Sequence, residues 1–121
     1  MNLKNKIIES IEFATKELGW TLISEDWGSP VQKCTCAMGC VMLKDQPQNP
    51  YRVGNNASAT IYAAEVLGVT EKWVDAFING YDDNPPLYEE DEDSDNAWNL
   101  GKEIAAATKP ITHEEFKNGK R

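Results

Sequence analysis

The sequence has no long apolar run and no basic cluster, and it has only one histidine and three cysteines. No stretch approaches the ~20 apolar residues that a membrane-spanning helix needs. The start of the chain, MNLKNKIIESIEF, carries Glu9 and Glu12 where a secretion signal would be apolar. We therefore expect a cytoplasmic protein without membrane contact. A reducing compartment and an odd number of thiols also disfavour a disulfide framework.

Runs of valine and isoleucine bounded by turn residues are also missing, so a sheet is not expected as the main architecture. Apolar residues instead recur at helical spacing, most regularly over residues 71–80. The 121 residues fit one domain. We expect a single all-α domain over residues 1–121, with about five short helices. Near residues 20–32 we expect irregular structure with at most a short extended piece.

Capping residues predict where these helices begin and end. The predicted helices cover residues 3–18, 34–43, 57–67, 71–80, 96–109 and 113–118. Asn2 can cap the first helix and Gly19 can close it in a left-handed conformation. Thr70 is a suitable N-cap for the helix over 71–80. The letters THEE at 112–115 have the Thr–x–x–Glu pattern of a capping box, which predicts the start of the final helix.

Bases are absent from one segment, which carries all of the net charge. The chain has 20 acids, 12 bases and a formal net charge of −8. Eight of the acids lie in this segment: Asp82, Asp83, Glu89, Glu90, Asp91, Glu92, Asp93 and Asp95. Without these eight, 12 acids would balance 12 bases. We predict an acidic loop over 82–95, and its charge would repel nucleic acid phosphates.

All three cysteines fall within KCTCAMGCVML, residues 33–43. The candidate metal ligands are Cys34, Cys36, Cys40 and the single histidine, His113. Zinc would need all four, because its structural sites are tetrahedral. The spacing is irregular, however, and i, i+4 cysteines are equally typical of one buried helix face. We favour a packed helix and expect no bound cofactor. A redox site lacks the C-x-x-C spacing.

Two other possible sites depart from their motifs. DEDSDNAWNLGKE places Asp91, Asp93 and Asp95 at the first, third and fifth positions of a calcium loop. Asn96 then stands where the loop needs glycine, and Lys102 stands where it needs a bidentate glutamate. A cysteine–histidine pair with His113 is the other possibility, but His113 is expected to be exposed in a first helical turn. No catalytic residue is assigned.

The strings CAMGCVML, AAEVLGV, FINGYDD and AWNLGKEIA resemble short bacterial and phage proteins of unknown function. The similarity spans roughly residues 34–106. It rests on a Cys–small–x–Gly helix, a Phe–x–x–Gly–aromatic–Asp element and an Ala–x–x–Leu–Gly helix. The resemblance implies a helical fold in which Gly39, Gly80 and Gly101 have structural roles. It implies no activity.

These observations predict a non-catalytic binding module. Tyrosines beside acids are typical of docking surfaces. The predicted partner-binding residues are Tyr81, Asp82, Asp83, Tyr88, Glu89, Glu90, Asp91, Glu92, Asp93 and Asp95. They would meet a basic protein surface, in the manner of a phage-type inhibitor of a nucleic-acid-binding protein. The alternative is a small metal-binding protein that uses the cysteine cluster and His113.

Overall fold

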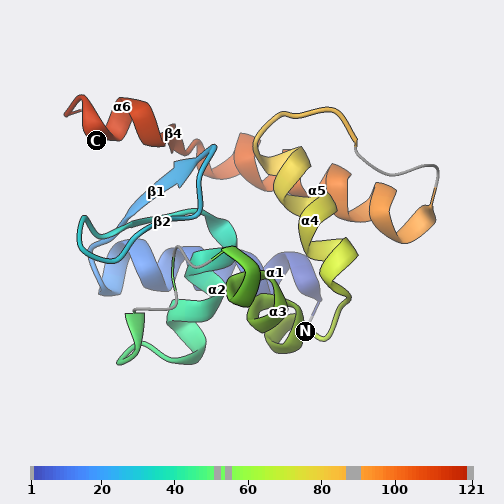
Figure 1. The fold of residues 1–121 in the computed structure, drawn as a ribbon, viewed down its shortest axis with the longest axis horizontal. Coiled ribbons are helices and arrows are strands. Elements are labelled where there is room, and N and C mark those ends of the chain that lie inside the picture. Colours follow the sequence, from blue (N-terminus) through green and yellow to red (C-terminus); the bar gives the residue numbers. More distant parts are fainter. Residues whose placement is uncertain (1, 51–52, 54–55, 87–90, 120–121) are drawn as a thin grey trace.

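The computed structural model describes residues 2–50, 53, 56–86 and 91–119. Within them the chain forms six α-helices and a small four-stranded sheet (Figure 1). The domain is therefore mostly helical, as predicted, but it is not all-α. No helix in the described part of the chain has the length and apolar character needed to span a membrane.

The helices agree with the predicted segments, with two shifted starts. They are α1 (Leu3–Glu12), α2 (Ala37–Asp45), α3 (Asn56–Leu67), α4 (Glu71–Tyr81), α5 (Glu92–Thr108) and α6 (His113–Lys117). A π-helical turn, η1 (Phe13–Glu17), continues α1. The predicted caps are confirmed: the side chains of Asn2 and Thr70 accept backbone N–H groups, and Thr112 and Glu115 form the reciprocal capping box.

The sheet has the strand order β2-β3-β1-β4. Its strands are β1 (Thr21–Ser24), β2 (Gly28–Ser29), β3 (Cys34–Thr35) and β4 (Ile111–Thr112). The central strand β1 pairs in parallel with both β3 and β4, whereas β2 pairs antiparallel with β3. The prediction is confirmed only in part: the short extended piece expected near residues 20–32 corresponds to β1 and β2, but a four-stranded sheet was not expected. Three of the four strands are only two residues long, so they carry no alternating pattern that a sequence could reveal.

The main core lies among the helices. Buried side chains from α1 to α5, together with Trp20, Leu22 and Trp27, form one large cluster. A second, smaller cluster consists of Ile23, Cys34 and Phe116 and lies between the sheet and α6. The sheet therefore separates the helical core from a small satellite core.

Helices α4 and α5 cross at a very close distance, because a glycine from each helix lies at the contact. A Cβ built on Gly80 would lie 1.9 Å from the carbonyl oxygen of Trp98. A Cβ built on Gly101 would lie 2.2 Å from the carbonyl oxygen of Phe77. Any side chain at these positions would push the two backbones apart. Gly39 of α2 is similarly confined, since its Cβ would lie 1.8 Å from Oγ1 of Thr35.

Candidate functional site

Two carboxylates of the acidic segment are each held by a lysine of a neighbouring helix. Asp83 follows α4 and pairs with Lys102 of α5, with 2.7 Å between Oδ1 and Nζ. Asp91 precedes α5 and pairs with Lys72 of α4, again with 2.7 Å between Oδ2 and Nζ. Together with the glycine contacts, these pairs show that α4 and α5 run in the same general direction.

The predicted acidic loop over 82–95 is too long, because α5 begins at Glu92. Asp91 is the N-cap, and its carboxylate accepts hydrogen bonds from the Asp93 amide (3.1 Å) and the Ser94 hydroxyl (3.3 Å). The first turn thus carries Glu92, Asp93 and Asp95. Their charges are favourable there, because the N-terminal end of a helix dipole is positive. The predicted helix, in contrast, begins only at residue 96.

The predicted docking residues fall into distinct groups. Asp83, Glu92, Asp93 and Asp95 are exposed, while Asp82 and Asp91 are half-buried. Tyr88, Glu89 and Glu90 lie outside the described residues. Tyr81 is buried, and its hydroxyl donates a hydrogen bond of 2.8 Å to the carbonyl of Ile23. Its prediction as a docking residue is therefore wrong: it lies on the apolar face of α4, one turn after Phe77, against which its ring stacks.

The local environment changes the pKa of three of these carboxyl groups. The hydrogen bond from Lys102 lowers the pKa of Asp83, and the hydrogen bond from Lys72 lowers the pKa of Asp91. Burial raises the pKa of Asp82, although its Oδ1 accepts a hydrogen bond of 2.8 Å from the Glu25 amide. Asp82 thus connects the end of α4 to the segment after β1. At Asp83 and Asp91 the lysine hydrogen bonds favour the charged form of the carboxyl group.

The three cysteines do not share one helix. Cys34 lies in β3 and is buried in the small satellite core, while Cys36 is the N-cap of α2 and Cys40 lies one turn further on. Cys36 and Cys40 belong to the main core, as the packed-helix prediction requires. Burial raises the pKa of Cys36 to about 12 and that of Cys40 well above its ordinary value. These thiols therefore have little thiolate character at neutral pH.

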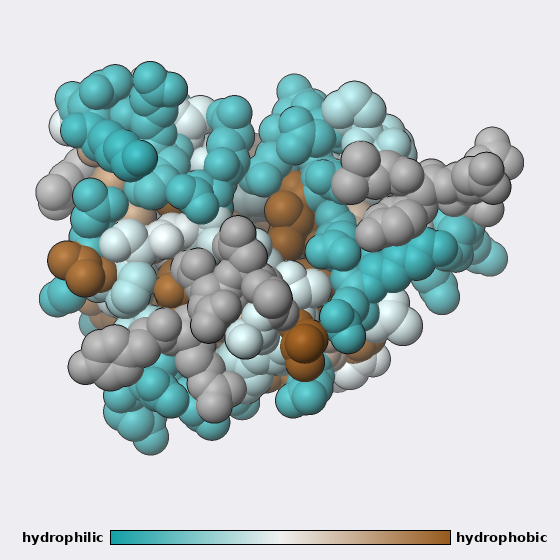
Figure 2. Space-filling model, in the orientation of Figure 1, coloured by the Kyte–Doolittle hydropathy of each residue, from teal (hydrophilic) through white to brown (hydrophobic). Residues whose placement is uncertain are grey.

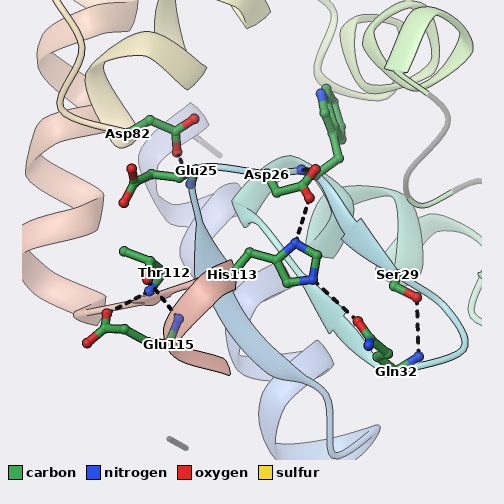
Figure 3. Close-up of polar contacts among 9 residues, drawn as sticks. Glu25, Asp26, Ser29, Gln32, Asp82, Thr112, His113 and Glu115 are labelled. Carbon is green, nitrogen blue, oxygen red and sulfur yellow. Dashed lines mark hydrogen bonds and ion pairs between the residues drawn. The ribbon is translucent and has the colours of Figure 1, made fainter. Parts of the chain in front are cut away.

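His113 is less exposed than predicted, and its ring is hydrogen-bonded on both sides. Its side chain is 12% exposed. Nδ1 lies 2.6 Å from Oδ2 of Asp26, and Nε2 lies 3.3 Å from Oε1 of Gln32 (Figure 3). The four residues proposed as zinc ligands are thus distributed among the main core, the satellite core and this polar contact. Among all described residues, no three histidine, cysteine or acidic side chains gather to hold a metal ion.

Sequence reasoning did not identify Glu25, Asp26 and Gln32 as neighbours of His113. Glu25 and Asp26 follow β1, and Glu25 has a left-handed backbone with φ of 68°. Glu25 borders two open grooves. One, of about 340 Å³, is lined by Asp82, Asp83, Lys102 and Lys109 among others. The other, of about 490 Å³, is lined by Glu25, Asp26, Thr112, His113, Glu114, Lys117 and Asn118. More than 80 residues separate Asp26 from His113, so no local motif could indicate the pair.

Comparison with known proteins gives no match: no family model, no curated protein and no solved structure is similar to this chain.

Proposed function

We propose that this chain is a non-catalytic binding protein whose acidic surface docks on a basic face of a partner protein. The supporting observation is the arrangement of the carboxylates around the start of α5. Glu92, Asp93 and Asp95 are exposed and make no ion pair with any residue that the structure describes. We call these three residues the acidic turn. A partner that uses a basic face to hold nucleic acid would fit it, which is the mode of a phage-type inhibitor.

The scaffold supports such a role because the acidic turn lies on a helix and not on a free tail. Lys72 holds the N-cap residue Asp91, and the Gly80–Trp98 contact fixes α5 against α4. Charges on a rigid element lose little conformational entropy when they bind. Such charges mainly raise the association rate and give specificity.

The rest of the surface favours electrostatic docking over apolar docking. Among the described residues, only Val31 and Ile61 are large hydrophobic side chains with substantial exposure. Figure 2 shows a face on which hydrophobic residues are scattered among hydrophilic ones. Isolated exposed apolar residues are common and do not define an interface.

A charge-neutralising variant tests this proposal. The triple variant Glu92→Gln, Asp93→Asn, Asp95→Asn removes the acidic turn, and Glu9→Gln, Glu17→Gln, Glu65→Gln removes three exposed acids elsewhere. Both variants change the net charge equally. Tagged proteins would be used to capture partners from the native host at low salt. We expect wild type and the control triple variant at Glu9, Glu17 and Glu65 to recover the same basic protein. The acidic-turn variant should recover much less of it.

Salt dependence provides a second readout with the captured protein. The Debye length falls from ~10 Å at 0.1 M salt to ~3 Å at 1 M, so wild-type association should slow as salt rises. The acidic-turn variant should have lost most of this dependence. Thermal melting would confirm that it is folded, since each lost helix-dipole contact costs only roughly 0.3–1 kcal/mol. Equal recovery and equal salt slopes for the two variants would contradict the proposal.

A further inference from the structure

The last described elements, β4 and α6, form a C-terminal strap over Ile111–Lys117. The strap leaves α5 through Lys109, whose φ is 51°, and pairs with β1 through two residues. Phe116 of the strap is buried in the satellite core with Ile23 and Cys34, and Ile111 packs against them. The strap thus closes a small core of its own, separate from the main helical core. Such a limited contact area is typical of a segment that opens locally.

His113 links this strap to two other segments through hydrogen bonds. Its ring joins the strap to Asp26, which follows β1, and to Gln32, which lies between β2 and β3 (Figure 3). The backbone amide of Gln32 also donates to Oγ of Ser29, at 3.3 Å, so Gln32 is itself anchored in its turn. One imidazole therefore connects three segments that are distant in sequence.

The charge state of His113 decides how many of these contacts it can make. Both atoms that its ring faces are oxygens, a carboxylate oxygen and an amide oxygen, and both can only accept hydrogen bonds. A neutral imidazole has one N–H and can donate to only one of them, whereas an imidazolium donates to both. We infer that a proton on His113 closes the strap, and that loss of this proton releases the contact with Gln32.

More acids than bases surround the ring. Glu25 and Asp26 after β1 and Glu114 on α6 line the same groove, with Lys117 of α6 as the one base among its lining residues. Asp82, at the end of α4, contacts this group through the Glu25 amide. Because only the imidazolium can donate to both oxygens, we expect the strap to be held more firmly at low pH than at high pH. This inference does not depend on the acidic turn or its partner.

Hydrogen exchange of the full-length chain tests the inference. Protection of the strap amides would be measured at about pH 5.5 and about pH 8, after correction for the intrinsic exchange rate at each pH. We expect protection to fall roughly tenfold at the higher pH, as for the loss of one charge-assisted hydrogen bond. Amides in the middle of α4 should keep their protection at both values.

Variants of two glutamines separate the proposed contact from a general pH effect. Gln32→Met removes the acceptor, so its strap should behave at both pH values as the wild-type strap does at high pH. Gln48→Met is the control, because Gln48 is also exposed but lies in the connection after α2, and it should keep the wild-type pH dependence. Nitrogen chemical shifts of His113 should report an imidazolium at the lower pH.

Three results would overturn the inference. The first is equal wild-type protection at both pH values. The second is an unchanged pH dependence in Gln32→Met. The third is a neutral His113 ring at the lower pH, which would mean that Gln32 turns its amide nitrogen, and not its oxygen, toward Nε2.

Discussion

Replacement of Gly101 by alanine is the most direct perturbation of this fold. In an unobstructed helix this change would stabilise the protein by up to ~1 kcal/mol, since alanine is the better helix former. In α5, however, the new Cβ would lie 2.2 Å from the Phe77 carbonyl oxygen and 2.7 Å from the Tyr81 amide nitrogen. Both obstacles are backbone atoms, so no side-chain rotation can relieve the contact.

The cost follows from the distance that the helices must move. Ordinary contacts of a Cβ begin at 3.4 Å, so α5 has to withdraw from α4 by about 1 Å. Overpacking of a close contact costs ~1–3 kcal/mol, and a rigid backbone obstacle places this case near the upper end. After subtraction of the gain in helix propensity, we expect a net loss of about 2 kcal/mol. For a chain of this size, that corresponds to a fall in Tm of roughly 8 °C.

Urea unfolding and thermal melting followed by circular dichroism would measure this loss. Asn99→Ala is the matched control, because Asn99 is exposed on the same helix and lacks any obstacle, so a gain of up to ~0.7 kcal/mol is expected there. Gly80→Ala should behave like Gly101→Ala. Should Gly101→Ala be as stable as wild type, the close crossing of α4 and α5 would be refuted.

Three further predictions concern the core and the thiols. Tyr81→Phe should lower the free energy of unfolding by ~1–3 kcal/mol in urea, because it leaves the buried Ile23 carbonyl without its donor; no change would show that this hydroxyl is not needed. The free energy of unfolding should fall above about pH 8.5. In that range the thiols of the unfolded chain lose their protons, whereas the raised pKa values of Cys36 and Cys40 keep the thiols of the folded chain protonated. A pH series of urea midpoints would check this, and Cys40→Ala should reduce the slope. Purified protein should contain well under one zinc per chain, and a chelator should leave Tm unchanged, since structural zinc would contribute directly to folding; mass spectrometry of the native protein would detect a stoichiometric metal.

The sequence by itself determined most of the helices and several of their ends. Helical periodicity and capping act within about four residues, so Asn2, Thr70 and the Thr112–Glu115 capping box could be recognised from local spacing alone. The start of α5 was misplaced because Asp91 and Asp95 are equally good caps by residue type. The choice between them depends on Lys72, which lies on another helix.

Other features were decided only by the tertiary structure. The sheet exists because β1 lies between two short segments, β3 and β4, and β4 is almost 90 residues further along the chain. The i, i+4 spacing from Phe77 places Tyr81 on the apolar face of α4, but only the tertiary structure brings its hydroxyl to the Ile23 carbonyl.

The separation of the thiols and the contacts of His113 have the same origin. Cys34 faces the satellite core, while Cys36 and Cys40 face the main core, although all three lie within seven positions of the sequence. His113 meets Asp26 only because β4 pairs with β1. Local sequence sets the conformation of a segment, whereas long-range pairing of the backbone determines which side chains meet, and no short pattern records that pairing.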